Sequence, residues 1–336
     1  MQILIYKIEI SYFCILMFKR FRIISIVAFF VFVLTTAFRH SVNSIEISKE
    51  TLGEKLFFDS ALSLDYSISC ASCHIPQFAF ADTVAFSKGV GGKFGQRNTP
   101  SVMNVKYRDR FFYDGRAKDI IDQVHFPIQD PNEMNLSMDS LVQRLSVNSN
   151  YVKWFNAIYK EGPTKQNIAD AIAAYEMTLE TSNTPFDAFM NDVPNSLNES
   201  EQRGRGVFLS DKAKCFDCHF GPDFTGDEFK NIGLYDGLKW NDKGLFGITK
   251  DSADFGKFKV PGLRNVGVTG PYMHNGAFKT LKVVIDYYDN PFSTVAKPIN
   301  IDESLKKPLG LTPQEKEDLL NFLLSLTDKQ FKNRTY

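Results

Sequence analysis

Two short segments of the sequence carry the pattern Cys-x-x-Cys-His. They are Cys70-Ala71-Ser72-Cys73-His74 and Cys215-Phe216-Asp217-Cys218-His219. Two thiols at this spacing can form thioether bonds to the two vinyl groups of one haem, and the adjoining histidine can then bind the haem iron. Because the sequence has only five cysteines and five histidines, two chance matches are not expected. The spacing therefore predicts two covalently bound c-type haems.

Cysteine pairs of this kind also occur at other sites. Four cysteines in two pairs can bind a structural zinc ion, and a single pair can be a redox-active dithiol. A zinc site would leave the two adjoining histidines unexplained, and the stretch between the two pairs is longer than in compact zinc modules. Covalent haem is favoured, and an absorption spectrum of the purified protein distinguishes it from both alternatives.

The N-terminal segment has the composition of an export signal. Residues 23–38 contain no charged side chain, and basic residues flank them on both sides. This layout predicts a signal peptide or an N-terminal membrane anchor in residues 1–40. The folded part is then expected in the periplasm, which agrees with attachment of c-type haem outside the bacterial cytoplasm.

Charge argues against one class of partner. Residues 1–40 hold five of the 39 Lys and Arg and one of the 39 Asp and Glu, which leaves 34 basic and 38 acidic residues. The remainder is mildly acidic and has no basic stripe of the kind that binds nucleic acid. No nucleic-acid partner is expected.

A weak internal repeat predicts two domains. Short helices are expected at residues 51–58 and 203–208, each just ahead of a haem motif. The fold class is therefore mainly α, with two cytochrome c-like haem domains and long loops. We expect an N-terminal domain over residues 41–196 and a C-terminal domain over residues 197–336.

Two further helices are expected from apolar side chains at helical spacing. Thr312-Pro313-Gln314-Glu315 predicts the start of the last helix, which packs either within the second domain or back onto the first. Ile168, Ile172, Tyr175 and Leu179 predict another helix, closed by Asn183-Thr184-Pro185. The Gly/Asn-rich residues 229–256 favour long loops rather than strands.

Several other segments resemble a known family. The chain is similar to the bacterial diheme cytochrome c peroxidases and their MauG-type relatives over nearly all of its length after residue 40. Besides the first haem motif, the matching segments are Arg97-Asn98-Thr99-Pro100-Ser101, Asp114-Gly115-Arg116-Ala117, Asp130-Pro131-Asn132-Glu133-Met134, Lys259-Val260-Pro261-Gly262-Leu263-Arg264-Asn265 and Gly270-Pro271-Tyr272-Met273-His274-Asn275-Gly276.

The resemblance implies roles for individual residues. The first haem, with His74 as iron ligand, would be the peroxide site, and the second, with His219, would relay electrons. Glu133 would be the acid/base group that takes a proton from hydrogen peroxide and returns it to the leaving oxygen. Gln123 and Pro127 would line the same pocket. Taken alone, Glu133 would be interpreted as a solvated carboxylate.

Three positions near the first haem depart from the family or are ambiguous. Inactive resting members carry a blocking histidine in a Gly-His-Gly segment, which here reads Gly89-Val90-Gly91, and valine cannot bind iron. The family's tryptophan between the haems corresponds to Tyr113. His125 is either a second acid/base group or, as we favour, a structural imidazole.

The second haem and a calcium site are also implied. Tyr288 stands where peroxidases have a methionine, so it is the predicted sixth ligand of the second iron, as in MauG-type enzymes. Met273 is the alternative ligand. His274 is expected near the second haem as a hydrogen-bonding group. A further set matches the interdomain calcium site, where oxygen ligands suit a hard cation: Asn98, Thr269 and Pro271.

Three functions follow from these residues. The leading hypothesis is a periplasmic peroxidase that reduces hydrogen peroxide to water with electrons from a small cytochrome c or a cupredoxin. The second is a MauG-like oxidase that uses peroxide to oxidise a protein or small-molecule partner. The third, a diheme electron carrier, has no use for an open iron beside Glu133.

Overall fold

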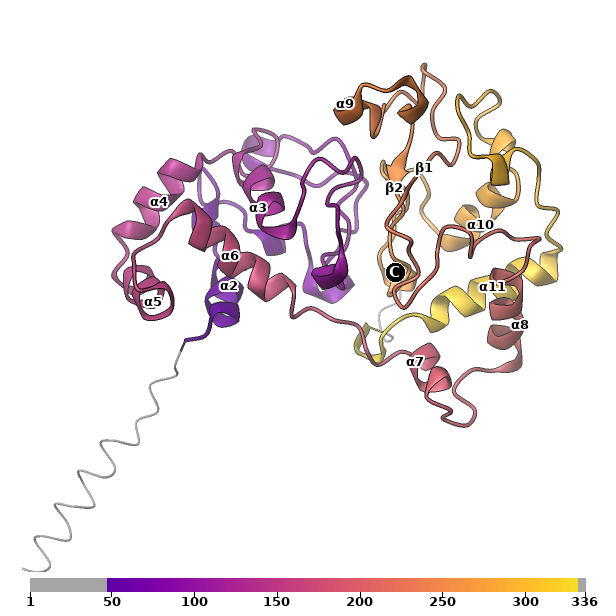
Figure 1. Ribbon diagram of the computed structural model, residues 1–336, viewed down its shortest axis with the longest axis horizontal. Helices are drawn as coiled ribbons and strands as arrows, with labels where there is room; N and C mark the ends of the chain where they lie inside the picture. The colour runs from indigo at the N-terminus through magenta and orange to yellow at the C-terminus, as the bar shows by residue number, and fades with distance from the viewer. Residues whose placement is uncertain (1–46, 332–336) are drawn as a thin grey trace, which may run out of the picture. The chain divides into compact units, whose positions relative to one another are not determined.

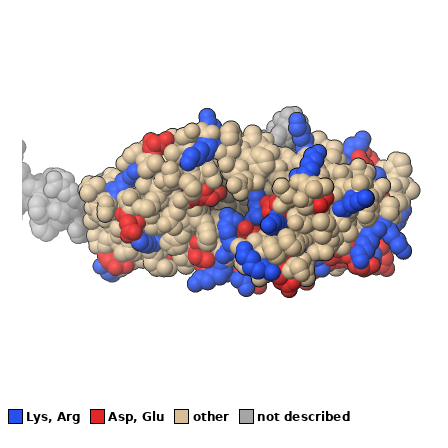
Figure 2. Space-filling view, turned by 90° about the horizontal axis from the view of Figure 1, so that it is seen from above, with Lys and Arg blue, Asp and Glu red and all other residues tan. Residues whose placement is uncertain are grey.

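The computed structural model describes residues 47–331, which are mainly helical (Figure 1). The predicted export segment, residues 1–40, lies outside the described residues. Within residues 47–331 none of the helices combines the length and the apolar character needed to cross a lipid bilayer. On the face shown in Figure 2, basic and acidic side chains are interspersed.

The described helices and strands fall into two halves. The first half contains α2 (Lys49–Phe57), α3 (Ile120–Gln129), α4 (Met138–Ser146), α5 (Ser149–Tyr159) and α6 (Lys165–Glu176). The second half contains α7 (Pro185–Met190), α8 (Glu199–Phe208), β1 (Phe229–Lys230), α9 (Phe246–Thr249), β2 (Phe258–Lys259), α10 (Leu281–Asp289) and α11 (Pro313–Ser325).

One helix crossing occurs in both halves. In the first half α2 packs on α6, and in the second α8 packs on α11. A Cβ atom at Gly53 would lie 1.9 Å from the carbonyl oxygen of Ala171, and one at Gly204 would lie 1.9 Å from that of Asp318. Each pair can approach this closely only because a glycine stands at the crossing. The predicted repeat of residues 51–58 and 203–208 is confirmed.

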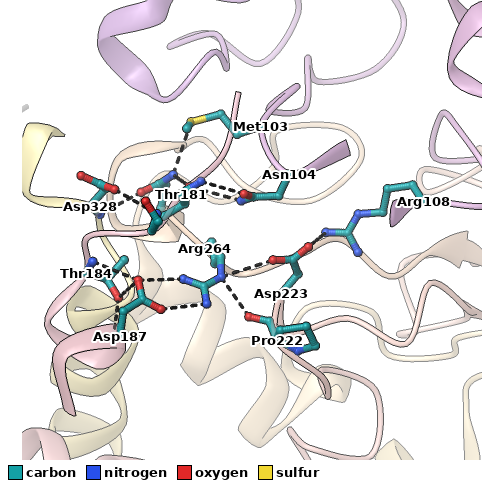
Figure 3. Close-up of polar contacts among 12 residues, drawn as sticks. Met103, Asn104, Arg108, Thr181, Thr184, Asp187, Pro222, Asp223, Arg264 and Asp328 are labelled. Atoms are coloured by element: carbon teal, nitrogen blue, oxygen red, sulfur yellow. Dashed lines mark hydrogen bonds and ion pairs between the residues drawn. The ribbon is translucent and has the colours of Figure 1, made fainter. Parts of the chain in front are cut away.

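A second shared feature is an asparagine that hydrogen-bonds to the backbone just after each crossing helix, α6 or α11. Asn104 and Asn265 both adopt the left-handed conformation. The Oδ1 atom of Asn104 accepts a hydrogen bond from the Thr181 amide (2.8 Å), and that of Asn265 accepts one from the Asp328 amide (2.9 Å). Both asparagine side chains also donate to the Thr181 hydroxyl (Figure 3). The two halves are therefore built on one plan and joined at Thr181.

The core of the second half is aromatic and includes α7. Phe208, Phe224 and Phe322 are buried against one another. The Phe186 ring of α7 packs on Phe224 and Phe322 at centroid distances of 5.1 and 5.8 Å. Because α7 precedes residue 197, its packing extends the second core ahead of the predicted domain boundary.

The last helix starts where the sequence predicts. The Thr312 side chain accepts from the Glu315 amide, and Glu315 bonds back to the Thr312 amide. Helix α11 packs on α8 and α10. Beyond the helix, Phe331 packs against Ala79 and Met103 of the first half. The helix itself therefore lies within the second half, and only the segment after it returns to the first.

Two sequence predictions need correction. Helix α6 ends at Glu176, so Leu179 lies beyond it, and Asn183-Thr184-Pro185 begins α7 rather than closing α6. The physical reason is the Thr184 hydroxyl, which accepts the Asp187 amide as an N-cap (2.9 Å). Residues 229–256 were expected to form loops only, but β1 pairs with β2 in a short antiparallel ladder.

Candidate active site and haem sites

The first Cys-x-x-Cys-His segment forms a tight turn that fixes its histidine. The His74 amide donates to the Cys70 carbonyl oxygen (2.8 Å), and Nδ1 of its ring lies 3.1 Å from the carbonyl oxygen of Phe80. A carbonyl can only accept, so the Nδ1 atom carries the proton and Nε2 keeps the lone pair that binds metal. Burial lowers the pKa of His74, which favours the neutral imidazole that a metal ligand requires.

The second segment repeats this arrangement. The His219 amide donates to the Cys215 carbonyl oxygen (2.9 Å), and Nδ1 of His219 lies 3.0 Å from the carbonyl oxygen of Phe224. Burial lowers the pKa of His219 as well. Both histidines are therefore oriented by backbone carbonyls with Nε2 left for iron.

The thiols do not have the character of a redox dithiol. Burial raises the pKa of both Cys73 and Cys218 to about 11, whereas catalytic dithiols have lowered pKa values. The two pairs also belong to different halves of the chain. Apolar side chains line the cavity beside the second pair, which suits a flat apolar group: Leu281, Ile285, Leu319 and Leu323.

Helix α3 and the loop after it position the predicted acid/base residues. Gln123 and Pro127 are four residues apart and lie on one helix face. The loop then folds back along α3, because the Met134 amide donates to the Pro127 carbonyl oxygen (3.1 Å) and the Glu133 amide to that of Asp130 (3.0 Å). The structure thus brings the Glu133 segment beside the helix that carries Gln123 and Pro127.

The Glu133 carboxyl group has a raised pKa. Its burial is the main cause, and the negative charge of Asp130 adds to it, while Arg116 opposes the shift. A carboxyl group in these surroundings can hold a proton and release it, as general acid/base chemistry requires. His125 is two residues from both Gln123 and Pro127, so it lies on another face of α3.

The segment Gly89-Val90-Gly91, in which valine replaces the family's blocking histidine, packs directly on the loop that carries Glu133. The Val90 amide donates to the Glu133 carbonyl oxygen (2.8 Å), and Val90 is buried. A Cβ atom at Gly89 would lie 2.0 Å from the Asn132 carbonyl oxygen, so only glycine fits there. The side chain at position 90 is a hydrocarbon and offers no donor atom to a metal.

Arg116 is a site residue to which the sequence analysis gave no role. Its guanidinium stacks on the Phe112 ring at 3.5 Å and bonds to the Asp114 carboxylate (3.0 Å). It is also the positive charge that opposes the raised pKa of Glu133. The Asp-Gly-Arg segment was the available signal, but it does not show which group the arginine would face.

In the second half, the two neighbouring tyrosines of α10 differ in their surroundings. The Tyr287 hydroxyl donates to the Ile232 carbonyl oxygen (2.6 Å). Tyr288 instead lines the cavity that also contains His219, and burial followed by the Cys218 and Cys215 thiols raises the pKa of its hydroxyl. A cation bound at that oxygen would oppose the shift. Met273 lines the same cavity, so both predicted ligands remain candidates.

Two equivalent backbone hydrogen bonds join the halves. The Lys259 amide donates to the Tyr113 carbonyl oxygen (2.8 Å), and the Asn98 amide donates to that of His274 (2.7 Å). Tyr113 and His274 hold corresponding places, each one residue after a residue with positive φ, Phe112 and Met273. Burial raises the pKa of Tyr113 to about 12.

His274 lies beside Phe258 in a dry environment. The imidazole stacks on the Phe258 ring with centroids 3.7 Å apart, and it is 5% exposed. Burial lowers the pKa of His274 to about 4; Asp242 acts in the opposite direction. His274 is therefore neutral near pH 7. Its Nε2 atom is 3.9 Å from the Asp242 carboxylate, which is beyond hydrogen-bond distance.

An ion-pair network lies next to these residues. Arg97 of the first half bonds to Asp114 (2.6 Å) and to both carboxylate oxygens of Asp242 from the second half (2.7 and 2.8 Å). Burial alone would raise the pKa of Asp242, but Arg97 holds it below its ordinary value. Asp242 is not predictable from the sequence, because a single aspartate in a Gly/Asn-rich stretch gives no signal.

A second network holds the loop that follows the second haem motif. Arg264 bonds to Asp187 of α7 (2.9 Å) and to Asp223 (3.3 Å), and Arg108 of the first half also reaches Asp223 (3.4 Å) (Figure 3). The guanidinium of Arg264 also donates to the Pro222 carbonyl oxygen (2.9 Å). A half-buried arginine that bonds to two carboxylates, as Arg264 does, fixes a loop position more firmly than an exposed pair does.

The comparisons with known proteins agree with this geometry. A family model described as di-haem cytochrome c peroxidase matches residues 47–194. The methylamine utilization protein MauG of Methylorubrum extorquens is 35% identical over 288 residues, which cover 84% of this chain and 79% of that protein. The cytochrome c551 peroxidase of Pseudomonas aeruginosa is 34% identical over 294 residues, covering 85% and 80%. The chain belongs to the di-haem cytochrome c peroxidase family.

Solved structures extend the similarity to the fold. The crystal structure of the diheme peroxidase BthA from Burkholderia thailandensis matches with a TM-score of 0.75 and 26% identity, covering 84% of this chain and 86% of that one. A MauG-like protein associated with microbial copper homeostasis matches with a TM-score of 0.74 and 32% identity. This member of the di-haem peroxidase family therefore has two cytochrome c-like domains and is an oxidoreductase acting on peroxide.

The residues predicted to bind calcium all line one large cavity. Asn98, Thr269 and Pro271 line the cavity that Tyr113 and His219 also line. The Asn98 Nδ2 atom donates to the Val84 carbonyl oxygen (3.1 Å), so the other side of its amide presents an oxygen. Carbonyl and amide oxygens are the ligands that calcium prefers.

Proposed function

We propose that this protein is a periplasmic enzyme that reduces hydrogen peroxide to water with electrons from a small cytochrome c or a cupredoxin. The observation that carries the proposal is the difference between Pro127 and Tyr288 at one shared helical position. Helix α3 begins after the N-cap Asp119, and α10 begins after the N-cap Thr280. Counted from these caps, Pro127 and Tyr288 are equivalent.

This difference supports separate functions for the two halves, peroxide binding in the first and electron transfer in the second. The Pro127 ring has no atom that can bind a metal, whereas the Tyr288 hydroxyl can. The first half would thus leave one side of its haem accessible, with Glu133 beside it, and the second half would close both sides with His219 and Tyr288. An accessible site suits peroxide, and a closed site suits electron transfer.

The chain's own residues contribute proton transfer to the reaction. When held by Cys70, Cys73 and His74, the first haem would supply the redox chemistry that passes the donor's electrons to peroxide. Glu133 accepts a proton from one peroxide oxygen and returns it to the other, so that water leaves instead of hydroxide. Consumption of two electrons and two protons per peroxide gives two water molecules. Burial beside Asp130 keeps the Glu133 carboxyl able to carry that proton.

Tyr113 is proposed as the relay between the halves. Its carbonyl oxygen is bonded to the Lys259 amide, and Lys259 is two residues before Pro261, whose backbone lies next to the His219 ring. The covalent and hydrogen-bonded path from the second haem motif to Tyr113 is therefore short. Asn98, Thr269 and Pro271 are proposed to bind calcium at the same junction, and residues 1–40 to direct export or anchor the chain.

A MauG-like oxidase is the second candidate. Tyr288 favours it, because an anionic oxygen ligand stabilises the oxidised form of the second haem and thereby permits withdrawal of electrons from a partner. In that case the partner would be a protein or a small molecule that is oxidised while peroxide is consumed. A pure electron carrier is disfavoured by Glu133 and Pro127.

Steady-state peroxide consumption tests the proposal. The holoprotein is mixed with hydrogen peroxide and reduced cytochrome c, or with reduced cupredoxin in a parallel assay. We expect oxidation of two donor molecules per peroxide consumed. Rapid reaction with peroxide but no donor oxidation would support the oxidase instead, and no reaction with peroxide would support the carrier.

A further inference from the structure

Helices α6 and α11 are equivalent, and their residues can be matched one by one. A Cβ atom at Gly53 would lie 2.8 Å from the Cβ of Tyr175, and one at Gly204 would lie 2.8 Å from that of Phe322. Tyr175 and Phe322 therefore hold the same place at the two helix crossings. The residue that follows is Glu176 in the first half, and its counterpart in the second half is leucine.

The leucine of the second half shows what the fold requires at this position. Leu323 is 7% exposed and belongs to the aromatic core around Phe322. It also lines the cavity that contains Cys215 and His219. An apolar side chain that faces the haem cavity is thus sufficient for this helix crossing.

The Glu176 side chain is buried. It is 6% exposed, and within residues 47–331 its carboxylate has neither an ion pair nor a hydrogen bond. Burial alone raises the pKa of Glu176 to about 8. Because leucine at the equivalent position satisfies the same helix crossing, packing alone does not explain the choice of glutamate over leucine.

The carboxyl group lies beside the first haem attachment site. After burial, Glu176 is the largest influence on the pKa of the Cys70 thiol, ahead of Cys73 and Glu133. Glu54 of the adjacent helix α2 also acts on this region, since it and Glu176 both raise the pKa of Tyr175. Glu54 is exposed to solvent, which screens its charge.

We propose that Glu176 is a charge-compensating group of the first haem, which lowers the reduction potential of that haem and has no counterpart at the second. A carboxyl group in a dry pocket interacts strongly with charge that appears next to it. It therefore favours the ferric form, which carries one more positive charge than the ferrous form. The inference rests on the proposed role of the first haem as the one that reacts with peroxide.

The test is a reduction titration of the holoprotein at pH 9, above the pKa of Glu176, in which the two haems are resolved spectroscopically. Glu176→Gln removes the charge and keeps the size, and Glu176→Leu installs the residue of the second half. We expect both variants to change the equilibrium between ferric and ferrous first haem at least tenfold towards ferrous, which is about 59 mV for one electron. The second haem serves as an internal reference and should not change.

Glu54→Gln is the matched control, because it removes the same charge one helix away in solvent. Its potentials should equal those of the wild type. If Glu176→Gln leaves the first potential unchanged, or if Glu54→Gln shifts it equally, the inference is wrong. Should the glutamine variant fail to retain haem, the leucine variant decides in the same way, because leucine is compatible with this crossing.

The outcome is separable from that of the proposed function. If Glu176→Gln shifts the potential of the first haem but the wild-type protein does not turn over peroxide, the role of Glu176 is supported and the peroxidase proposal is contradicted. If the wild-type protein turns over peroxide and the Glu176 variants keep the wild-type potentials, the peroxidase proposal is supported and the role of Glu176 is contradicted.

Discussion

Pro127 and Tyr288 occupy the same position in helices α3 and α10, counted from the N-caps Asp119 and Thr280. The shared plan of the two halves makes this a comparison within one molecule. A residue that cannot bind metal stands in one half and a phenol stands in the other. The two halves can therefore share a fold and still give their haems different coordination.

The first prediction concerns the sixth ligand of the second haem. We expect Tyr288→Phe to abolish oxygen ligation and to shift the low-spin ferric spectrum of that haem, with an increase in its reduction potential. Tyr287→Phe is the matched control, because the Tyr287 hydroxyl is engaged by Ile232. An unchanged spectrum in Tyr288→Phe together with a changed one in Met273→Ala would assign the ligand to methionine.

The second prediction concerns Glu133. Glu133→Gln should retain both haems and slow peroxide turnover by about two to four orders of magnitude, the usual effect of removing a placed acid/base group. The control is Glu180→Gln, which neutralises an exposed carboxylate of the same half. Wild-type turnover in Glu133→Gln, measured at saturating donor, would exclude this carboxyl group from the reaction.

Activation is the subject of the third prediction. Because Val90 offers no ligand, the fully oxidised protein should react with peroxide without prior reduction. Stopped-flow mixing of the ferric protein with peroxide measures this directly. We expect Val90→His to create a resting form that reacts only after one-electron reduction. A wild-type protein with two low-spin haems and the same requirement for reduction would contradict the prediction.

Sequence reasoning succeeded where a local pattern suffices. The N-cap at Thr312 and the short helix ahead of each haem motif are local signals, and the structure has them as expected. It failed where a role depends on a distant partner. Asp242 is defined by Arg97, and Glu176 by the lack of an ion pair or hydrogen bond within residues 47–331, and neither relationship is visible along the chain.

Boundaries failed for a related reason. Asn183-Thr184-Pro185 contains signals both for a helix end and for a helix start, and sequence alone does not rank them. The structure shows that the Thr184 hydroxyl accepts the Asp187 amide, which fixes the start of α7. The Phe186 ring of this helix then packs on Phe322 in the core of the second half.

The fourth prediction is a pH dependence of stability from His274. Its pKa is about 4 in the folded protein against 6.5 ordinarily, so the unfolded chain binds a proton in this range that the folded protein does not. Stability is therefore unaffected above pH 6.5 and falls as the pH drops from 6.5 towards 4, by up to about 3 kcal/mol. When denaturation midpoints are plotted against pH, wild type and His274→Phe should have the same slope above pH 6.5 and different slopes below it. Parallel curves over the whole pH range would show that His274 is not the titrating group.

The last prediction uses two glycines of α8 that differ only in their neighbours. A Cβ atom at Gly204 would lie 1.9 Å from the Asp318 carbonyl oxygen, whereas one at Gly206 would meet nothing within 4 Å. Gly204→Ala must push α8 away from α11 and should lower the free energy of unfolding by about 1–3 kcal/mol or more. Gly206→Ala should raise it by up to about 1 kcal/mol, since alanine is the better helix former and no contact is disturbed. Equal effects of the two substitutions in denaturant unfolding would mean that helix propensity, and not the close crossing of α8 and α11, determines the response at position 204.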